Sequence, residues 1–138
     1  MPVPARAVWE ALADPGGYGY WVVGSKAIRD ADPGWPTVGT RFHHTIGVGP
    51  LRVADHTESL QAEPARLLRM RAKGRPLGTA QVTMELTPRD GGTLVRMTEN
   101  PDGVSGLLAL NPLVHLLTKA RNAESLMRLE ELALRRAP

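Results

Sequence analysis

The sequence predicts an α+β fold in which a curved antiparallel β-sheet wraps around a long C-terminal α-helix, with two short N-terminal helices. The first observation is the run Pro112–Leu134, which has no glycine or further proline and is rich in helix-favouring residues. The second is a series of β-like runs, separated by turn-forming residues, in the middle of the chain. A helix this long and apolar needs a large surface to pack on, and the sheet offers that surface.

Length and composition indicate one globular domain covering residues 1–138. Hydrophobic residues make up 42% of the chain and charged residues 22%, an ordinary globular balance. The chain has no cysteine, which excludes disulfides, zinc–thiolate sites and cysteine nucleophiles. No signal peptide is recognisable, and the longest apolar stretch, 104–117, is too interrupted to span a bilayer, so we expect a cytoplasmic protein.

The net charge is +3 and the isoelectric point is near 9.8. The basic residues are dispersed along the chain rather than gathered in a block. Aromatic residues make up only 4% of the chain, too few for a row of base-stacking platforms. We therefore expect no nucleic-acid partner.

The N-terminal part predicts two short helices and a strand. Apolar residues at helical spacing indicate a helix over Val3–Ala13, which the Asp-Pro-Gly-Gly run after it ends. Tyr18–Val23 is expected to be a second short helix or turn, and Ser25–Ala31 a strand. Five further strands are predicted: Thr40–Ile46, Leu51–Gln61, Arg66–Ala72, Leu77–Thr87 and Thr93–Glu99.

Alternation within these five strands predicts one buried face. In each run, the residues of one parity are the more apolar. Closing the hairpins over their turns gives four expected cross-strand pairs, each between two inner positions: Ile46 with Leu51, Ser59 with Leu68, Ala72 with Ala80, and Leu86 with Thr93. This agreement predicts an antiparallel meander, because a slip of one residue would break it.

The expected register arranges the inner face in rows. Two rows are mostly apolar: Ser59, Leu68, Met84 and Val95, then Thr40, Thr57, Met70, Val82 and Met97. In a third row, Asp55 and Glu99 flank two alanines, and Phe42 lies at its end: Phe42, Asp55, Ala72, Ala80 and Glu99. With His44 one row further on, the inner face is expected to grade from apolar to polar, with space above the alanines.

The C-terminal helix carries an apolar stripe that begins at Leu113, Val114, Leu117 and Ala120 and continues at Leu126, Met127, Leu129 and Leu134. The stripe moves around the helix as it advances. More than one side of the helix is therefore expected to need cover.

This order of elements resembles the helix-grip fold of the START/Bet v 1-like superfamily, which includes polyketide cyclase and aromatase-like proteins. The residues that carry the resemblance are Pro4 and Trp9 in the first helix, Trp21, Gly39-Thr40-Arg41-Phe42, Gly92-Thr93-x-Val95, and Arg121-Asn122 with Leu126 and Leu129 in the last helix. The resemblance implies a hydrophobic cavity between sheet and helix. Members usually begin with a strand before the first helix, and here that strand is absent or lies upstream of Met1.

Three inner-facing residues are candidates for proton transfer: Glu99, His44 and Asp55. An apolar-facing carboxylate is costly unless it is paired or hydrogen-bonded. For Glu99, a ligand-anchoring or acid–base role and an ion pair with Arg121 stay open, whereas a structural role is favoured for Asp55. His43 and His44 point to opposite faces of a strand, so we expect no metal site, and no cofactor motif is present.

We therefore expect a small hydrophobic ligand, such as a polyketide, lipid or isoprenoid-like molecule, in a cavity under the C-terminal helix. The expected lining is Trp21, Phe42, His44, Asp55, Met70, Val82, Met84, Met97, Glu99, Leu117 and Arg121. The alternatives are a cyclase, aromatase or dehydratase that uses the same polar groups, and an interaction module without a ligand. A homodimer through the edge strand Thr93–Glu99 is also expected if the usual first strand is missing.

Overall fold

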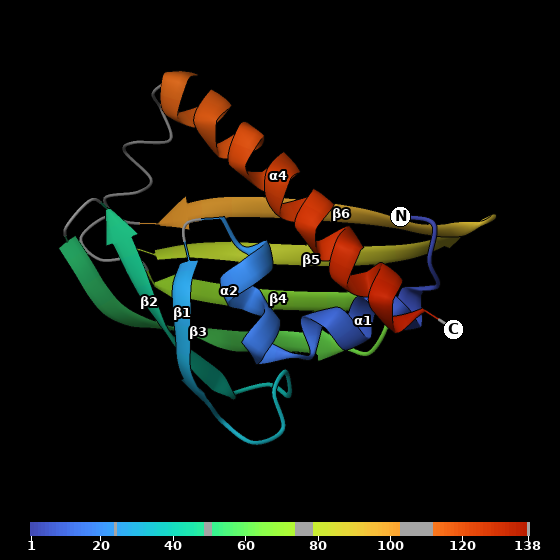
Figure 1. Cartoon of the computed structure of the whole chain (residues 1–138), viewed down its shortest axis with the longest axis horizontal. Helices are drawn as coiled ribbons and strands as arrows, with labels where there is room; N and C mark the ends of the chain where they lie inside the picture. The colour runs from blue at the N-terminus through green and yellow to red at the C-terminus, as the bar shows by residue number, and fades with distance from the viewer. Residues whose placement is uncertain (24, 49–50, 74–78, 103–111, 138) are drawn as a thin grey trace.

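The computed structural model describes residues 1–23, 25–48, 51–73, 79–102 and 112–137 (Figure 1). The N-terminal part contains helix α1 (Ala5–Leu12), the short helix η1 (Pro15–Gly17) and helix α2 (Tyr18–Trp21). Six strands follow: β1 (Ser25–Ala31), β2 (Arg41–Val48), β3 (Leu51–Glu63), β4 (Leu67–Lys73), β5 (Thr79–Arg89) and β6 (Gly92–Asp102). Helix α4 (Pro112–Arg136) ends the chain.

The strands form one six-stranded sheet in the order β1-β2-β3-β4-β5-β6, and each is antiparallel to its neighbours. The predicted meander, the short N-terminal helices and the long C-terminal helix are confirmed, and together they form the helix-grip fold. The predicted first strand, Ser25–Ala31, matches β1 at both ends. The predicted beginning of β5 at Leu77 lies outside the described residues.

The predicted pairing is right in parity and mostly wrong in register. Ala72 pairs with Ala80 as expected. The other three predicted pairs are each shifted by two residues: Ile46 pairs with Val53, Ser59 with Met70, and Leu86 with Val95. The β5–β6 turn, between Arg89 and Gly92, is centred one residue further along the chain than we expected, and β3 has a register shift between Ser59 and Gln61. A shift of two keeps each side chain on its face.

The shift changes which inner residues are neighbours. Asp55 pairs with His44, and Glu99 pairs with Val82. The expected row in which Asp55 and Glu99 flank two alanines is therefore wrong. Instead, Phe42, Thr57, Ala72 and Ala80 follow one another across four strands.

The core lies between the sheet and the N-terminal helices. Helix α1 buries Ala7, Val8, Ala11 and Leu12. Its last turn is fixed by two buried donors, because the Tyr18 hydroxyl and the Trp35 indole N–H both donate to the carbonyl of Leu12, at 2.7 and 3.1 Å. These bonds satisfy a carbonyl that the helix itself leaves without a partner.

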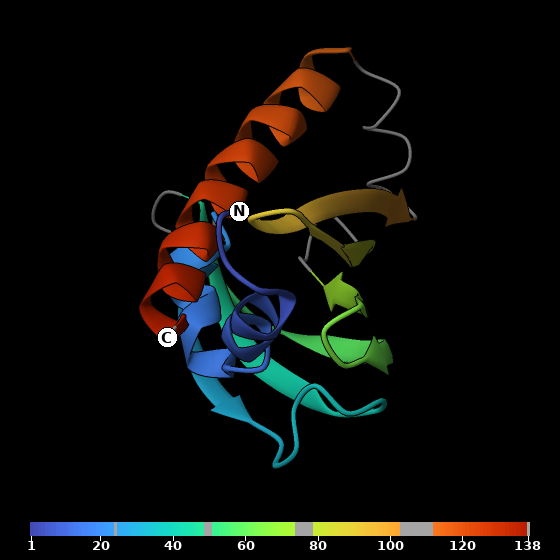
Figure 2. The same cartoon turned by 90° about the vertical axis from the view of Figure 1, so that its right-hand side faces the viewer.

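Helix α4 packs on α1 and α2 through its C-terminal half, where Ser125, Leu129 and Ala133 are buried. Towards Pro112 the helix rises away from α1 and α2 (Figures 1 and 2). Leu113 is 62% exposed and Leu117 is 60% exposed. The expectation that the sheet covers this first part of the apolar stripe is wrong for these two side chains. The side chain of Val114 lies outside the described residues.

The N-terminus lies against the edge of the sheet at β6 (Figure 1). The Met1 amino group donates to the Thr93 carbonyl at 2.9 Å, and the Thr93 N–H donates to the Met1 carbonyl at 2.8 Å. This reciprocal pair extends the antiparallel hydrogen bonding by one residue. Pairing of two copies along Thr93–Glu99 stays a prediction. In the part of the chain that the structure describes, no helix is long and apolar enough to cross a membrane.

Candidate functional site

The apolar part of the inner face is a solid core. Trp21, Phe42, Met70 and Met84 are all at most 3% exposed. The Tyr18 ring packs on Phe42 with 4.6 Å between centroids, and the Tyr18 hydroxyl lies 3.7 Å from the Met70 sulfur. Phe42 and Met70, two of the expected ligand-lining residues, thus contact the N-terminal helices, to which Trp21 itself belongs.

A row of buried polar side chains continues this face. His44 is 5% exposed, Asp55 3% and Thr57 5%. The alternation of β2 and β3 points all three inward, as the sequence predicted. His44 Nε2 lies 3.1 Å from the Thr57 hydroxyl, and Asp55 is the cross-strand neighbour of His44. The pattern had placed Thr57 on the inner face without giving it a role, because threonine is also an ordinary strand residue.

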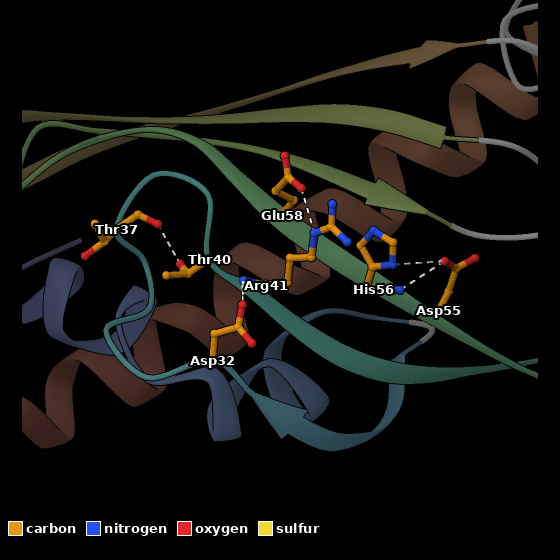
Figure 3. A network of polar contacts seen from close by, with 7 residues as sticks. All are labelled: Asp32, Thr37, Thr40, Arg41, Asp55, His56 and Glu58. Carbon is orange, nitrogen blue, oxygen red and sulfur yellow. Dashed lines mark hydrogen bonds and ion pairs between the residues drawn. The ribbon is translucent and has the colours of Figure 1, made fainter.

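Asp55 also bonds locally, as Figure 3 shows. Its carboxylate accepts the backbone N–H of His56 at 3.0 Å, and His56 Nδ1 lies 3.9 Å from the same oxygen. His56 belongs to the outer face, beside an ion pair in which Arg41 Nε lies 2.7 Å from Glu58 Oε1. Burial, followed by the nearby cations Arg41 and Lys73, lowers the pKa of His56. The outer cluster therefore favours a neutral imidazole.

The four histidines form no metal centre within the described chain. His44 lies inside, while His43 faces outward with its ring 6.1 Å from that of His56. The side chain of His115 lies outside the described residues. Among the residues that the structure describes, no group of three or more His, Cys, Asp or Glu side chains is placed to hold a metal ion.

Glu99 and Arg121 form an ion pair between β6 and α4. The guanidinium Nη2 lies 2.5 and 2.7 Å from the two carboxylate oxygens. The Glu99 side chain is 15% exposed and that of Arg121 is 42% exposed. The ion pair with Arg121, one of the two roles left open for Glu99, is therefore present. Arg121 offsets the charge of this inner-facing carboxylate.

Solvent reaches the inner face beside the polar row. Ala72 and Ala80 face inward but are only half-buried, as are Met97 and Glu99. Val82, between Met70 and Glu99, is 8% exposed. No described side chain therefore covers the two alanines fully, and they continue the row that begins with Phe42 and Thr57.

Two surface depressions are lined wholly by described residues, and neither contains the candidate site. One, of about 190 Å³, lies between β6 and α4, and Leu94, Val95 and Met127 line it. The other lies between the first residues of the chain and the β5–β6 turn. The expected cavity is thus not outlined by these depressions.

Trp21 carries an unsatisfied polar atom. The side chain is 1% exposed, and its indole Nε1 has no hydrogen-bond partner among the residues that the structure describes. A buried donor without an acceptor costs roughly 1–3 kcal/mol. Sequence reasoning placed Trp21 at the site without finding this feature, because hydrogen-bond satisfaction depends on the packed structure.

Comparison with known proteins gives a family match over most of the chain. Residues 1–133 match the family model described as polyketide cyclase / dehydrase and lipid transport. No curated protein matches the chain.

Solved structures share the fold at low sequence identity. A protein from Nitrosomonas europaea is 17% identical with a TM-score of 0.73, covering 98% of this chain and 90% of that one. Ara h 8.0201 is 16% identical with a TM-score of 0.74, covering 97% and 92%. The di-domain ARO/CYC StfQ of the steffimycin biosynthetic pathway is 11% identical with a TM-score of 0.71, and the match covers 99% of this chain and 48% of that one.

Proposed function

Because the chain belongs to the polyketide cyclase, dehydrase and lipid transport family, we propose that it binds a small hydrophobic molecule against the inner face of its sheet, beneath the first half of α4. The ligand classes that fit are polyketides, lipids and isoprenoid-like compounds. One observation carries the proposal: the half-buried alanines Ala72 and Ala80 continue the row of Thr57, whose hydroxyl meets buried His44. An apolar ligand covering the alanines would bring its polar end to this pair.

Two kinds of contact are available to such a ligand. Val82 and Met97 offer apolar surface next to the alanines, and burial of apolar area contributes about 25 cal/mol per Å². Thr57 and His44 offer hydrogen bonds that would fix orientation. A mostly apolar molecule with one or two oxygen atoms fits this set.

Native mass spectrometry of the protein purified from its own host tests the proposal. We expect a fraction of the protein to carry an added small-molecule mass that disappears when the same sample is denatured. Organic extraction of that sample should then release a compound of low polarity. Apo protein that also fails to bind added fatty acids and polyketide-like aromatics would contradict the proposal.

A second candidate function is catalysis of the cyclase, aromatase or dehydratase type. Its support is the buried cross-strand pair of His44 and Asp55, since a histidine beside a carboxylate suits general acid–base chemistry. Glu99 is a weaker candidate because Arg121 already holds its carboxylate. His44→Gln should lower turnover by about 100-fold or more and change affinity little if the protein is an enzyme of this kind. If His44→Gln lowered ligand affinity and turnover by the same factor, a binding role would be favoured.

A further inference from the structure

The outer face of α4 carries an exposed apolar stripe with a seven-residue repeat. Leu113, Ala120, Met127 and Leu134 are each seven residues apart, and Leu116 and Ala123 lie three residues after the first two. All six are exposed, and the large ones strongly so: Leu113 is 62% exposed, Leu116 63%, Met127 59% and Leu134 46%. We call these six residues the outer stripe.

The outer stripe lies on a different side of α4 from the residues that pack on α1 and α2, and its Met127 also borders the depression between β6 and α4. The packed side buries Ser125, Leu129 and Ala133. Met127 lies two residues before Leu129, which places it about 200° away around the helix. The fold therefore explains one apolar side of α4 and leaves the other in solvent, where a contiguous apolar surface of this size is typical of an interaction site.

We propose that the outer stripe pairs with the outer stripe of a second copy of this chain, so that two α4 helices pack side by side. A repeat of apolar residues with alternating steps of three and four residues is the pattern by which two helices supercoil. Ala120 and Ala123 at the centre let the two backbones approach closely, while the leucines and Met127 fill the space on either side. Both copies offer the same surface, as a two-fold dimer requires.

The charges beside the outer stripe favour a parallel arrangement of the two helices. Lys119 directly precedes the stripe residue Ala120, and Glu124 directly follows the stripe residue Ala123. The two charged residues are therefore five positions apart. In a parallel pair, Lys119 of one copy lies beside Glu124 of the other, and symmetry repeats the contact. After Leu116 and Ala123, the next position of this kind in the repeat is Glu130, whose charge interrupts the stripe. Contact should therefore be tightest from Leu113 to Met127.

The same charges disfavour a lipid surface as the occupant. Glu124, Glu130 and Glu131 lie on the second half of α4, next to Met127 and Leu134. Anionic headgroups would repel these three carboxylates, which the cations Arg128, Arg135 and Arg136 of the same half only balance in number. A second copy instead supplies apolar partners from Leu113 to Met127 and the cation Lys119 beside Glu124.

Sedimentation equilibrium of the full chain and two matched variants tests the proposal. Ala120→Glu places a charge at the centre of the outer stripe and keeps a good helix former. Val38→Glu places the same charge on another exposed apolar residue, 58% exposed, in the loop before β2. We expect a dimer for the parent chain and for Val38→Glu. In Ala120→Glu we expect the dissociation constant of the dimer to rise by about 100-fold or more, which shifts the protein toward monomer.

Circular dichroism and melting curves of Ala120→Glu should show a folded monomer, which separates loss of pairing from loss of folding. A single cysteine gives an independent readout, because the chain has none of its own. Oxidised Ala120→Cys should form a covalent dimer and Val38→Cys should not.

Three results would overturn the proposal. The first is a parent chain that stays monomeric at several hundred micromolar. The second is an Ala120→Glu dimer as tight as the parent dimer, which would move the interface elsewhere, such as the edge of β6. The third is a monomer that sediments with phosphatidylcholine–phosphatidylglycerol vesicles, and loses this binding in Ala120→Glu.

Discussion

Arg121 on α4 and Glu99 on β6 join the first half of the helix to the edge of the sheet, with one guanidinium nitrogen 2.5 and 2.7 Å from the two carboxylate oxygens. Arg121 belongs to the first half of α4, the half that rises away from α1 and α2 (Figure 2). It fixes the spacing between helix and sheet at the place where we propose that the ligand lies. Its strength therefore bears on the position of α4 more than on the stability of the whole fold.

Glu99→Gln is expected to lower the free energy of unfolding by no more than about 1 kcal/mol, because Arg121 is 42% exposed and water screens the pair. The difference from the parent should shrink further in 1 M salt. Urea unfolding at low and high salt measures both effects. Glu10→Gln, which breaks the exposed pair of Glu10 with Arg6 on α1, is the matched control. A loss of several kcal/mol would show that Glu99 has buried partners beyond Arg121.

Met70→Trp is expected to destabilise the fold by roughly 1–3 kcal/mol, because overpacking strains a filled core. Met70 is 3% exposed and its sulfur contacts the Tyr18 hydroxyl, so no space is available for the larger ring. Thermal unfolding checks this, with Met70→Leu as a variant of similar volume. An unchanged melting temperature for Met70→Trp would reveal a cavity beside Met70 after all.

Gly92→Ala is expected to release the N-terminus from β6. A β-carbon at Gly92 would lie 2.1 Å from the Met1 carbonyl oxygen, far inside contact distance. The parent chain should therefore lose roughly 1–3 kcal/mol of stability. In a chain that lacks Met1 and Pro2 the same substitution should cost little. Urea unfolding of the parent chain and the shortened chain, each with and without Gly92→Ala, measures both losses of stability. Equal losses in the two chains would show that the strain does not come from Met1.

Tyr18 should make the fold sensitive to alkaline pH. Burial is the main cause that raises the pKa of Tyr18 above its ordinary value of 10.0. The unfolded chain therefore loses the phenolic proton first, and stability should fall as pH rises above 10. Tyr18→Phe should reduce this alkaline loss, at a cost of about 0.5–1.5 kcal/mol at neutral pH for the hydrogen bond to Leu12. If the free energy of unfolding fell equally steeply with pH in the two proteins above pH 10, Tyr18 would not be the group that titrates on unfolding.

The sequence was sufficient to predict the order of elements and the inner face, but not the register. Parity survives a shift of two residues, so Met84 and Asp55 face inward whichever hairpin turn is chosen. Register depends on where each turn is centred, and the β5–β6 turn lies one residue further along the chain than the pattern suggested. For that reason Asp55 was expected in the row of Glu99 and instead pairs with His44.

The helix shows a different limit. Apolar spacing identified α4 from its first residue, Pro112, but could not say which apolar positions the domain itself covers. Leu129 is buried, whereas Leu117, an expected ligand contact, is 60% exposed. The movement of the stripe around the helix did carry information, because it predicted more than one covered side. In the structure α1 and α2 provide one of them.

Binding of a fluorescent apolar probe to Ala80→Trp and Gln81→Trp tests the central claim most directly. The two residues are neighbours on β5 and point to opposite faces, and both are half-buried. Titration with 1-anilinonaphthalene-8-sulfonate or a fluorescent fatty acid should show tight binding by the parent and by Gln81→Trp. Ala80→Trp should keep its melting temperature and lose affinity by about tenfold or more, because the indole fills the space above the alanines. Parent-like affinity in a folded Ala80→Trp would contradict a ligand site on the inner face.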